Sequence, residues 1–345
     1  MIKLTQFSKG SGCGCKIAPE ELALLLKTDL VSPENKQLLV GNDNNDDSAA
    51  FALDEKTALV STTDFFMPMV DDAFTFGQIA ACNAISDVYA MGAKPILSLG
   101  ILGWPLEKIP ATEAQQVLNG ARTICHKAGI SLSGGHSIES NEPFFGLSVN
   151  GMTDITRLKQ NSTALVGDYL FLTKPIGVGI LSSAFKRGIL KDNDYAKMIE
   201  IMTTLNIAGY EISNIKGVHA MTDVTGFGLL GHLNEMALGS KLSAEIHLSS
   251  VPIIEGIEFY TQQFCFPDIT TKNYNAYKND TDGLSGLEFI HLCDPQTSGG
   301  LLIAVSEEFL DEYINTIEPF DTFNIAKKPI GRIIEKKEKT VYLKP

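Results

Sequence analysis

The sequence predicts an α+β protein with two domains. Its 345 residues exceed the size of one ordinary domain. Runs of apolar and β-branched residues alternate with stretches of helical periodicity, and several strand-like runs follow one another, which is typical of mixed α+β domains rather than of a helical bundle. A polar stretch at 153–162 separates the two halves, so we expect domains at 1–155 and 156–345.

The individual elements follow from residue type and spacing. Strands are expected where short apolar runs are closed by Asp, Gly or Pro, at 58–63, 96–102, 144–149 and 169–172. Helices are expected where apolar residues recur every three or four positions, at 76–91, 112–128, 195–215 and 228–238. A second polar stretch, 270–282, is expected to be a long surface loop.

The composition excludes several classes of function. Lys and Arg number 28 against 41 Asp and Glu, a net charge of −13, which argues against binding the phosphate backbone of nucleic acids. No stretch approaches the ~20 continuous apolar residues of a membrane span. An acidic protein that binds a polyanion must also bind cations, because the two negative charges repel each other. If the ligand is a polyanion, the composition therefore predicts metal sites.

The segment 10–16 reads Gly-Ser-Gly-Cys-Gly-Cys-Lys, with two thiols and a lysine among three glycines. Glycine allows the backbone to move and to approach a ligand closely, and Lys16 favours the thiolate form of a neighbouring cysteine. This run predicts a mobile reactive loop. Taken alone, it is equally compatible with half of a zinc site or with a terminal tail that has no function.

The remaining cysteines do not complete a zinc site. Cys82, Cys125, Cys265 and Cys293 are scattered singly, although His291 lies two residues before Cys293. A disulfide framework is not expected in a chain of this length that begins without a secretory signal. We therefore expect a reducing, cytoplasmic setting.

Asp87 lies on the predicted helix 76–91, on the same face as Phe76, Ile79 and Asn83. The opposite side carries Ala81, Ile85 and Val88, so the helix is expected to be enclosed almost all round. A buried, unpaired carboxylate is costly, so Asp87 must be protonated, paired in a salt bridge or bound to metal.

Other acidic residues occupy similar positions. Asp46 and Asp47 follow a polar turn, Asp64 is expected to close the strand before it, and Asp223 follows the apolar run 218–221. Carboxylates at strand ends beside glycine turns are suited to Mg²⁺, which prefers oxygen ligands. Each residue could also be a cap or a turn residue, Asp43 and Asp46 above all.

The run Ser133-Gly134-Gly135-His136-Ser137 is expected to form a glycine-rich turn. Its backbone amides could bind phosphate oxygens, although a plain turn is the commoner explanation. The chain contains neither a P-loop motif nor a dinucleotide-binding glycine motif after a strand, which disfavours both of those sites.

Several segments, in order along the chain, resemble the selenophosphate synthetase (selenide, water dikinase) family, within the aminoimidazole ribonucleotide synthetase-like (PurM-like) superfamily. Asn83-Ala84-Ile85-Ser86-Asp87 is typical of the superfamily, and the cysteine loop is typical of the narrower family. The other matching segments are 4–6, 61–66, 102–105, 134–137, 221–228 and 294–300.

The resemblance implies ATP-dependent phosphorylation of selenide, with selenophosphate, orthophosphate and AMP as products, and a supply of activated selenium for selenocysteine and selenouridine synthesis. It assigns Cys13 and Lys16 to catalysis. It implies that the first domain binds ATP and metal behind a mobile loop at 1–20. The implied Mg²⁺ ligands are Asp47, Asp87 and Asp223. The implied ATP contacts are Lys16, Asn44, Asn45, Asp46, Asp64, Asp87, Gly135, His136 and Ser137.

The resemblance also implies a homodimer formed through the N-terminal domains. Relatives often carry arginine where this chain has Asn45, so a charged contact with the nucleotide is not expected there. Two alternatives remain open: a small-molecule kinase of the same superfamily that releases ADP, and a selenium- or sulfur-binding carrier without catalysis. The role of Cys15 also stays open.

Overall fold

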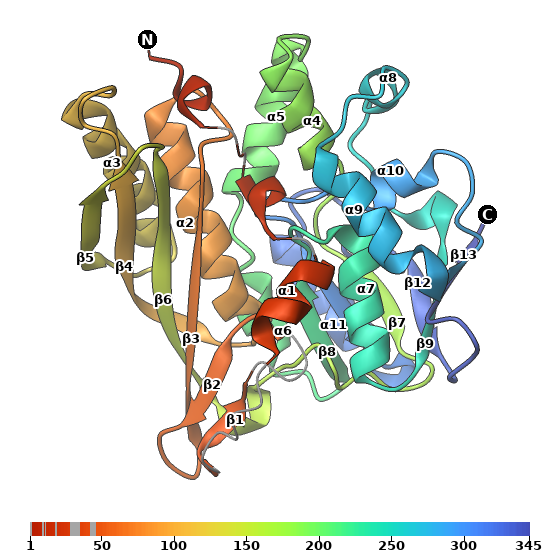
Figure 1. Cartoon of the computed structure of the whole chain (residues 1–345). Helices are drawn as coiled ribbons and strands as arrows, with labels where there is room; N and C mark the ends of the chain where they lie inside the picture. Colours follow the sequence, from red (N-terminus) through yellow and green to blue (C-terminus); the bar gives the residue numbers. More distant parts are fainter. Residues whose placement is uncertain (1, 9, 11, 18, 28–34, 42–45) are drawn as a thin grey trace.

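The computed structural model describes residues 2–8, 10, 12–17, 19–27, 35–41 and 46–345. Each half of the chain forms one β-sheet flanked by helices (Figure 1). This arrangement confirms the expected α+β class with two domains.

The first sheet has the strand order β1-β2-β3-β6-β4-β5, and its neighbours are antiparallel except for the parallel pair β4 and β5. Its strands are β1 Leu38–Val40, β2 Ala49–Ala52, β3 Thr57–Phe66, β4 Lys94–Trp104, β5 Leu132–Glu139 and β6 Phe144–Asp154. Two helices cover one face, α2 Ala73–Ala90 and α3 Ala111–Lys127. Before this sheet the chain forms the 3-10 helices Leu4–Phe7 and Gly12–Cys15 and helix α1 Pro19–Leu26.

The second sheet has the order β10-β13-β9-β12-β7-β11-β8. Its strands are β7 Tyr169–Leu172, β8 Val218–Asp223, β9 Ser243–His247, β10 Thr281–Asp282, β11 Leu301–Val305, β12 Gly331–Ile334 and β13 Val341–Lys344. The accompanying helices are α4 Val178–Lys186, α5 Asp192–Thr203, α6 Ala208–Ile212, α7 Gly228–Gly239, α8 Glu258–Thr261, α9 Asp268–Tyr277, α10 Glu288–Leu292 and α11 Leu310–Ile317. Apolar side chains of α7 pack on one face of this sheet, and those of α6 and α11 pack on the other.

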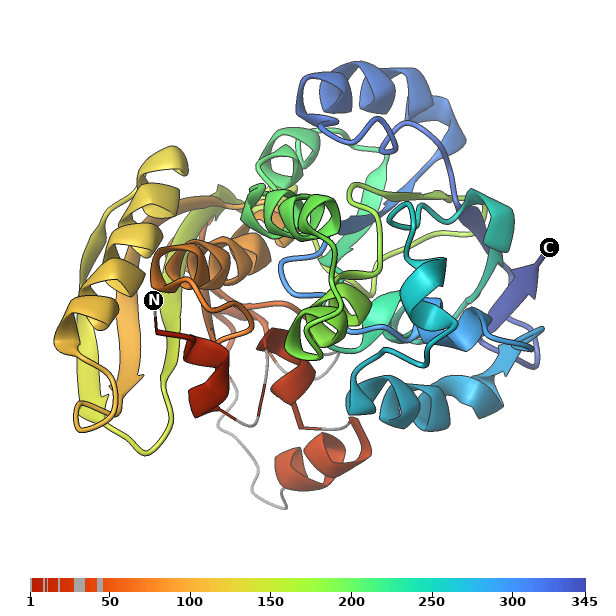
Figure 2. The same ribbon diagram turned by 90° about the horizontal axis from the view of Figure 1, so that it is seen from above.

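Helix α2 lies between the two halves of the molecule (Figures 1 and 2). It begins after Asp72, whose side chain accepts a hydrogen bond from Thr75 N at 2.7 Å and so caps the helix. One side packs on the first sheet, and the others contact α3, α5, α6 and β8. Nearly every residue of α2 is buried, which confirms the expectation of an enclosed helix. Polar side chains on α2 are therefore held between the two domains.

Two expectations about the second half were wrong. The single helix expected at 195–215 is interrupted after Thr203, giving α5 and α6. Tertiary contacts interrupt it, because the carbonyl of Thr204 accepts hydrogen bonds from Lys174 and Cys82. The loop expected at 270–282 is mainly helix α9, which buries Asn273 against backbone carbonyls despite its polar composition.

The glycine-rich turn expected at 133–137 is part of strand β5, at the edge of the first sheet. Glycine is needed there for close approach of two backbones, because a Cβ at Gly135 would lie 2.0 Å from the carbonyl oxygen of Gly100 on β4. Gly135 also has a φ of +142°. The segment is therefore a strand with exposed side chains rather than a turn.

The crossing of α2 and α3 gives a test of this packing. A Cβ at Gly77 would lie 1.9 Å from the carbonyl oxygen of Val117, so the two helices meet without room for a methyl group. We expect Gly77→Ala to lower the free energy of unfolding by about 2 kcal/mol, although alanine favours helix. Urea unfolding would measure this change. Gln116→Ala, at an exposed position of α3, serves as the control and should be close to neutral.

Candidate active site

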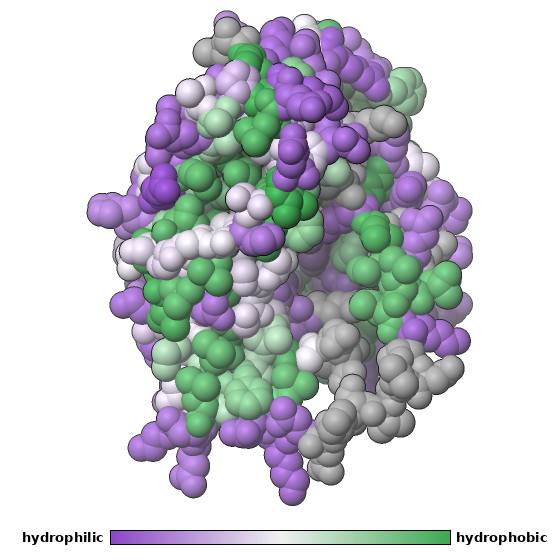
Figure 3. Space-filling view, turned by 60° about the vertical axis from the view of Figure 1, so that its left-hand side comes forward, coloured by the Kyte–Doolittle hydropathy of each residue, from purple (hydrophilic) through white to green (hydrophobic). Residues whose placement is uncertain are grey.

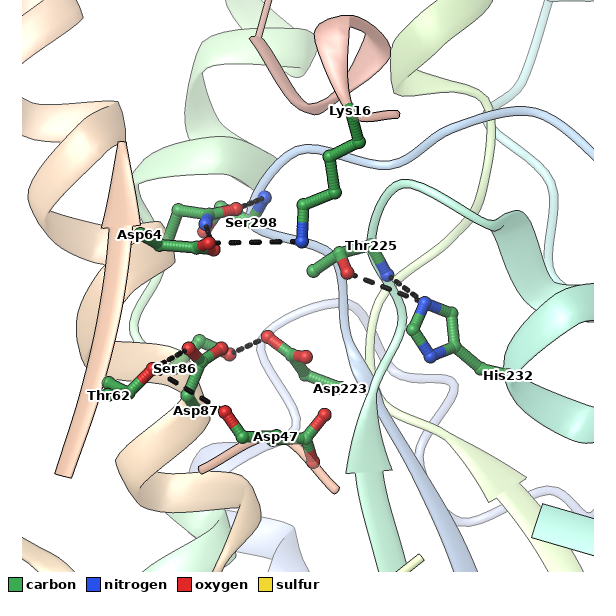
Figure 4. Close-up of polar contacts among 11 residues, drawn as sticks. Lys16, Asp47, Thr62, Asp64, Ser86, Asp87, Asp223, Thr225, His232 and Ser298 are labelled. Carbon is green, nitrogen blue, oxygen red and sulfur yellow. Dashed lines mark hydrogen bonds and ion pairs between the residues drawn. The ribbon is translucent and has the colours of Figure 1, made fainter. Parts of the chain in front are cut away.

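Three carboxylates from distant parts of the chain, the buried Asp87 and Asp223 and the half-buried Asp47, point toward one another at the junction of the two domains (Figure 4). Asp87 comes from α2, Asp223 is the last residue of β8, and Asp47 lies just before β2. Each accepts a hydrogen bond from a hydroxyl. Thr62 donates to Asp87 at 2.5 Å and Ser86 donates to Asp223 at 2.5 Å. The hydroxyl of Thr222 donates to Asp47 at 2.8 Å.

Burial and mutual repulsion make these carboxylates difficult to ionise together. The pKa of Asp87 is raised well above its usual range, first by burial and then by the charges of Asp64, Asp223 and Asp47. The pKa of Asp47 is raised in the same way, by burial and then by Asp223. Burial also raises the pKa of Asp223 to about 6, although the Ser86 hydroxyl and Lys16 oppose the rise.

The residues fit a hard cation. Among the described residues, no three His, Cys, Asp or Glu side chains are gathered closely enough to hold an ion outright. However, Asp47 Oδ2 is buried without a hydrogen-bond partner in the described part of the chain. A cation would satisfy this oxygen and would offset the burial and the mutual repulsion that raise the pKa values of the three carboxyls. The three carboxylates alone do not complete the coordination of a metal ion. They suit a metal ion that is also coordinated by oxygen atoms of a ligand, such as phosphate oxygens.

Lys16 approaches the cluster from the N-terminal segment (Figure 4). Its ammonium lies 3.8 Å from Asp64 Oδ1, and Asn83 Nδ2 donates to Asp64 Oδ2 at 2.5 Å. Asn83 in turn accepts a hydrogen bond from Ser298 N at 2.7 Å. The expectation that Asp64 ends its strand was wrong, because β3 continues to Phe66. The hydrogen-bonded strand therefore fixes the backbone on both sides of Asp64.

His232 supports the turn that follows Asp223. Its Nε2 accepts a hydrogen bond from Thr225 N at 3.0 Å, and its Nδ1 lies 3.4 Å from Glu235. Burial lowers the pKa of His232 to about 3, so the ring is neutral near pH 7. A neutral ring can accept this backbone hydrogen bond. The role of His232 is therefore to hold the chain beside Asp223.

The structure brings together Lys16, Asp47, Asp64, Asp87 and Asp223, as the resemblance implies. Asp46 lies beside them, where its carboxylate accepts a hydrogen bond from Asn161 N at 2.8 Å. Asn44 and Asn45 lie outside the described residues. The backbone of Cys13 belongs to the 3-10 helix Gly12–Cys15, and its side chain is outside the description.

Gly135, His136 and Ser137 do not join this group within one chain. They lie on β5, which β4 and β6 separate from β3 in the sheet. Sequence reasoning also missed the hydroxyls that orient the three carboxylates, namely those of Thr62, Ser86 and Thr222. It likewise missed Ser298, which donates to Asn83, and His232, which accepts from Thr225 N. The one available signal was that Ser86 and Thr222 each directly precede a predicted aspartate.

The two sheets and the acidic site between them define a protein of the AIR synthase related class. The family model of the AIR synthase related protein N-terminal domain matches residues 45–153, and that of the C-terminal domain matches residues 166–344. The described residues contain no helix long and apolar enough to cross a membrane.

The chain belongs to the selenide, water dikinase family and is an enzyme of the phosphotransferase class. It is 53% identical to the selenide, water dikinase of Shewanella sp. strain MR-4 over 307 residues, which are 89% of this chain and 87% of the relative. It is 51% identical to that of Shewanella baltica strain OS155 over 332 residues, 96% of this chain and 94% of the relative. For the Aeromonas hydrophila protein, identity is 50% and coverage is 89% of each chain.

Solved structures share the fold at low sequence identity. A thiamine-monophosphate kinase from Stenotrophomonas maltophilia has a TM-score of 0.66 at 19% identity, with 90% of this chain and 92% of that chain covered. The hydrogenase maturation protein HypE in complex with ATP has a TM-score of 0.64 at 17% identity, with 99% and 94% covered. These likenesses concern the fold alone.

Proposed function

We propose that this enzyme phosphorylates selenide with ATP in the presence of water and releases selenophosphate, AMP and orthophosphate. The observation that carries the proposal is the meeting of Asp47, Asp87 and Asp223 at the domain junction, with Lys16 close by. Family membership supports the choice of selenide as substrate. The product would supply selenium for selenocysteine and selenouridine synthesis, in the cytoplasm.

In this proposal Asp47, Asp87 and Asp223 hold magnesium ions that arrive with ATP. The metal, once bound, supplies positive charge that neutralises and aligns the phosphates, which is most of what phosphoryl transfer requires. The hydroxyls of Thr62 and Ser86 orient the carboxylates before ATP arrives. Lys16 is proposed to contact the transferred phosphate, and Asp64, whose carboxylate lies 3.8 Å from the Lys16 ammonium, is proposed to contact the nucleotide.

Cys13 is proposed to receive or position selenium, because a thiolate is a soft group that suits selenide. The loop that carries it would close over the nucleotide and exclude water from the first transfer. Asn44, Asn45 and Asp46 are proposed to contact ATP. The domain limits 1–155 and 156–345 belong to this proposal too.

The test is to incubate the purified enzyme with ATP, magnesium and anaerobic selenide, and to follow the products by phosphorus NMR. Selenide-dependent AMP together with a selenium-coupled phosphorus signal is the expected result. Formation of ADP alone would favour a small-molecule kinase. No nucleotide turnover with all components present would favour a carrier.

Lys16→Met is expected to lower kcat by about 10²-fold, because one preformed positive charge near the transferred phosphate is lost. The KM for ATP should change less, since the magnesium ligands remain. Steady-state kinetics would measure both values. Lys216→Met removes one exposed lysine elsewhere and should leave kcat unchanged. An equal kcat in the Lys16 variant and the wild type would contradict the proposed role.

A homodimer is proposed because the outer face of the first sheet is apolar and exposed. Phe65 is 53% exposed, Ile138 is 51% exposed and Leu99 is 39% exposed on strands of this sheet. Phe65 also contacts Phe144 across the face, with ring centroids 5.7 Å apart. Figure 3 shows hydrophobic residues gathered on this side of the molecule. A second copy would cover the face and supply His136 and Ser137 to a nucleotide site that lacks them within one chain.

Phe65→Glu is therefore expected to convert the dimer into a monomer and to weaken ATP binding. Analytical ultracentrifugation and equilibrium titration with an ATP analogue would measure the two effects. Leu238→Glu adds the same charge at an exposed apolar position of the second domain and should remain dimeric. A wild-type enzyme that is monomeric at working concentration would rule out this part of the proposal.

A further inference from the structure

A cavity of about 290 Å³ lies beside the cysteine loop, between that loop and helix α4. Gly10 and Gly14 form part of its wall on the loop side, and Ser182, Ser183, Lys186 and Arg187 form part of it on the α4 side. Met69, Phe266 and Thr297 contribute to the rest. None of the proposed magnesium or ATP residues is among the described residues that line it.

The segment 10–16 connects this cavity to the acidic cluster. Gly10 and Gly14 line the cavity, whereas Lys16 reaches Asp64 in the cluster. Cys13 directly precedes Gly14 in the chain. Two hydrogen bonds hold the segment beside the cavity in this structure: Lys186 donates to the Gly10 carbonyl at 2.9 Å, and Gly12 N donates to the Met67 carbonyl at 3.1 Å. A ligand in the cavity would therefore lie next to the loop that the proposed chemistry requires.

The charge of the cavity differs from that of the protein as a whole. Its described lining contains two cationic side chains, Lys186 and Arg187, and one carboxylate, Asp268. The whole chain has a net charge of −13. An anion without a bound metal would be repelled by Asp47, Asp64, Asp87 and Asp223, whereas the cavity offers positive charge at its surface.

The lining also suits a soft anion better than phosphate. Next to the serine hydroxyls and the cationic groups lie a thioether, Met69, and an aromatic ring, Phe266. Phosphate oxygens need many hydrogen-bond donors, whereas a large, weakly hydrated anion tolerates polarisable apolar neighbours. The volume holds such an anion together with several waters.

We propose that this cavity binds the selenium substrate as the hydrogenselenide anion, beside the cysteine loop and apart from the magnesium and ATP residues. The inference rests on the proposed function, because selenide is the substrate only if that function holds. It adds Ser183, Lys186 and Arg187 as residues that select and hold this substrate. Selenide and MgATP would then reach the loop from different directions.

Binding can be tested without turnover. Crystals of the enzyme soaked anaerobically in sodium hydrogenselenide should show a selenium anomalous peak in the cavity near Gly14 and Ser183. Calorimetric titration should show hydrogenselenide binding that orthophosphate does not displace. A selenium peak only at the acidic cluster, or tight orthophosphate binding without selenide binding, would overturn the inference. Neither result depends on whether the wild type forms selenophosphate.

Substitutions in the cavity provide a second test of selenide binding. Lys186→Met and Ser183→Phe are each expected to weaken hydrogenselenide binding by about tenfold, the first by loss of charge and the second by filling the cavity. ATP-analogue affinity should be unchanged in both. Lys186→Arg should restore binding, and Lys216→Met, outside the cavity, should leave it as in the wild type. Wild-type selenide affinity in both test variants would contradict the assignment.

Discussion

Asp87→Asn is expected to lower ATP-dependent turnover by at least about 10³-fold, because the site loses one of the charges proposed to hold magnesium. Asparagine has nearly the same shape and can still accept the hydrogen bond from Thr62. The fold should therefore persist, and the loss should appear in kcat rather than in expression or solubility.

The same variant should be more stable than the wild type when metal is absent. The pKa of Asp87 is raised by burial and by three neighbouring carboxylates, which means that its charge costs folding free energy near pH 7. The neutral asparagine removes this cost. The melting temperature with a chelator present should rise, and the further increase that magnesium and ATP produce in the wild type should be lost.

Asp154→Asn is the matched control for this experiment. Asp154 lies at the exposed end of β6, and hydrogen bonds from Thr156 lower the pKa of its carboxyl. Removing that charge should not raise stability, and turnover should be unchanged. Normal turnover in Asp87→Asn would contradict the assignment of Asp87 as a magnesium ligand, whatever the melting temperature of the variant.

Cys13→Ser is expected to abolish selenide-dependent formation of selenophosphate and AMP while leaving ATP binding intact. A hydroxyl is a hard, weakly acidic group and cannot replace a thiolate as a partner for selenium. The proposed ATP and magnesium residues do not include Cys13, so affinity for an ATP analogue should stay within about twofold of the wild type. Phosphorus NMR and calorimetry would measure the two properties.

Cys15→Ser makes the same chemical change two residues further along the loop and serves as the comparison. An equal loss of activity in the two variants would show that the loop as a whole, rather than the thiol at position 13, is required. Loss of ATP binding in Cys13→Ser would contradict the proposed role directly.

Local sequence patterns predicted most of the elements well. The strands expected at 58–63, 96–102 and 144–149 are β3, β4 and β6, each longer than expected, and the strand at 169–172 is β7. The helices at 76–91, 112–128 and 228–238 are α2, α3 and α7 within a few residues. These elements follow from residue type and spacing within each segment, which depend only on neighbouring residues.

The failures have a common physical cause, which is contact between residues distant in the chain. The helix 195–215 is interrupted where Asn206 turns inward to donate to Ser86 and to the Gly299 carbonyl. Helix α9 is polar in composition, yet Ile269 and Asn273 lie on one buried face. The glycines of β5 permit close contact with β4, which a sequence pattern does not distinguish from a turn.

For the site, the sequence by itself determined the identity of the acidic residues, the cysteine loop and the family, because these depend on residue type and local order. Only the tertiary structure decided that Asp47, Asp87 and Asp223 meet, that hydroxyls orient them, and that His136 lies at a remote sheet edge. The physical reason is that strand order and helix packing bring together residues far apart in the chain. Local periodicity indicates which face of a helix or strand is buried, but it does not indicate which other element packs on that face.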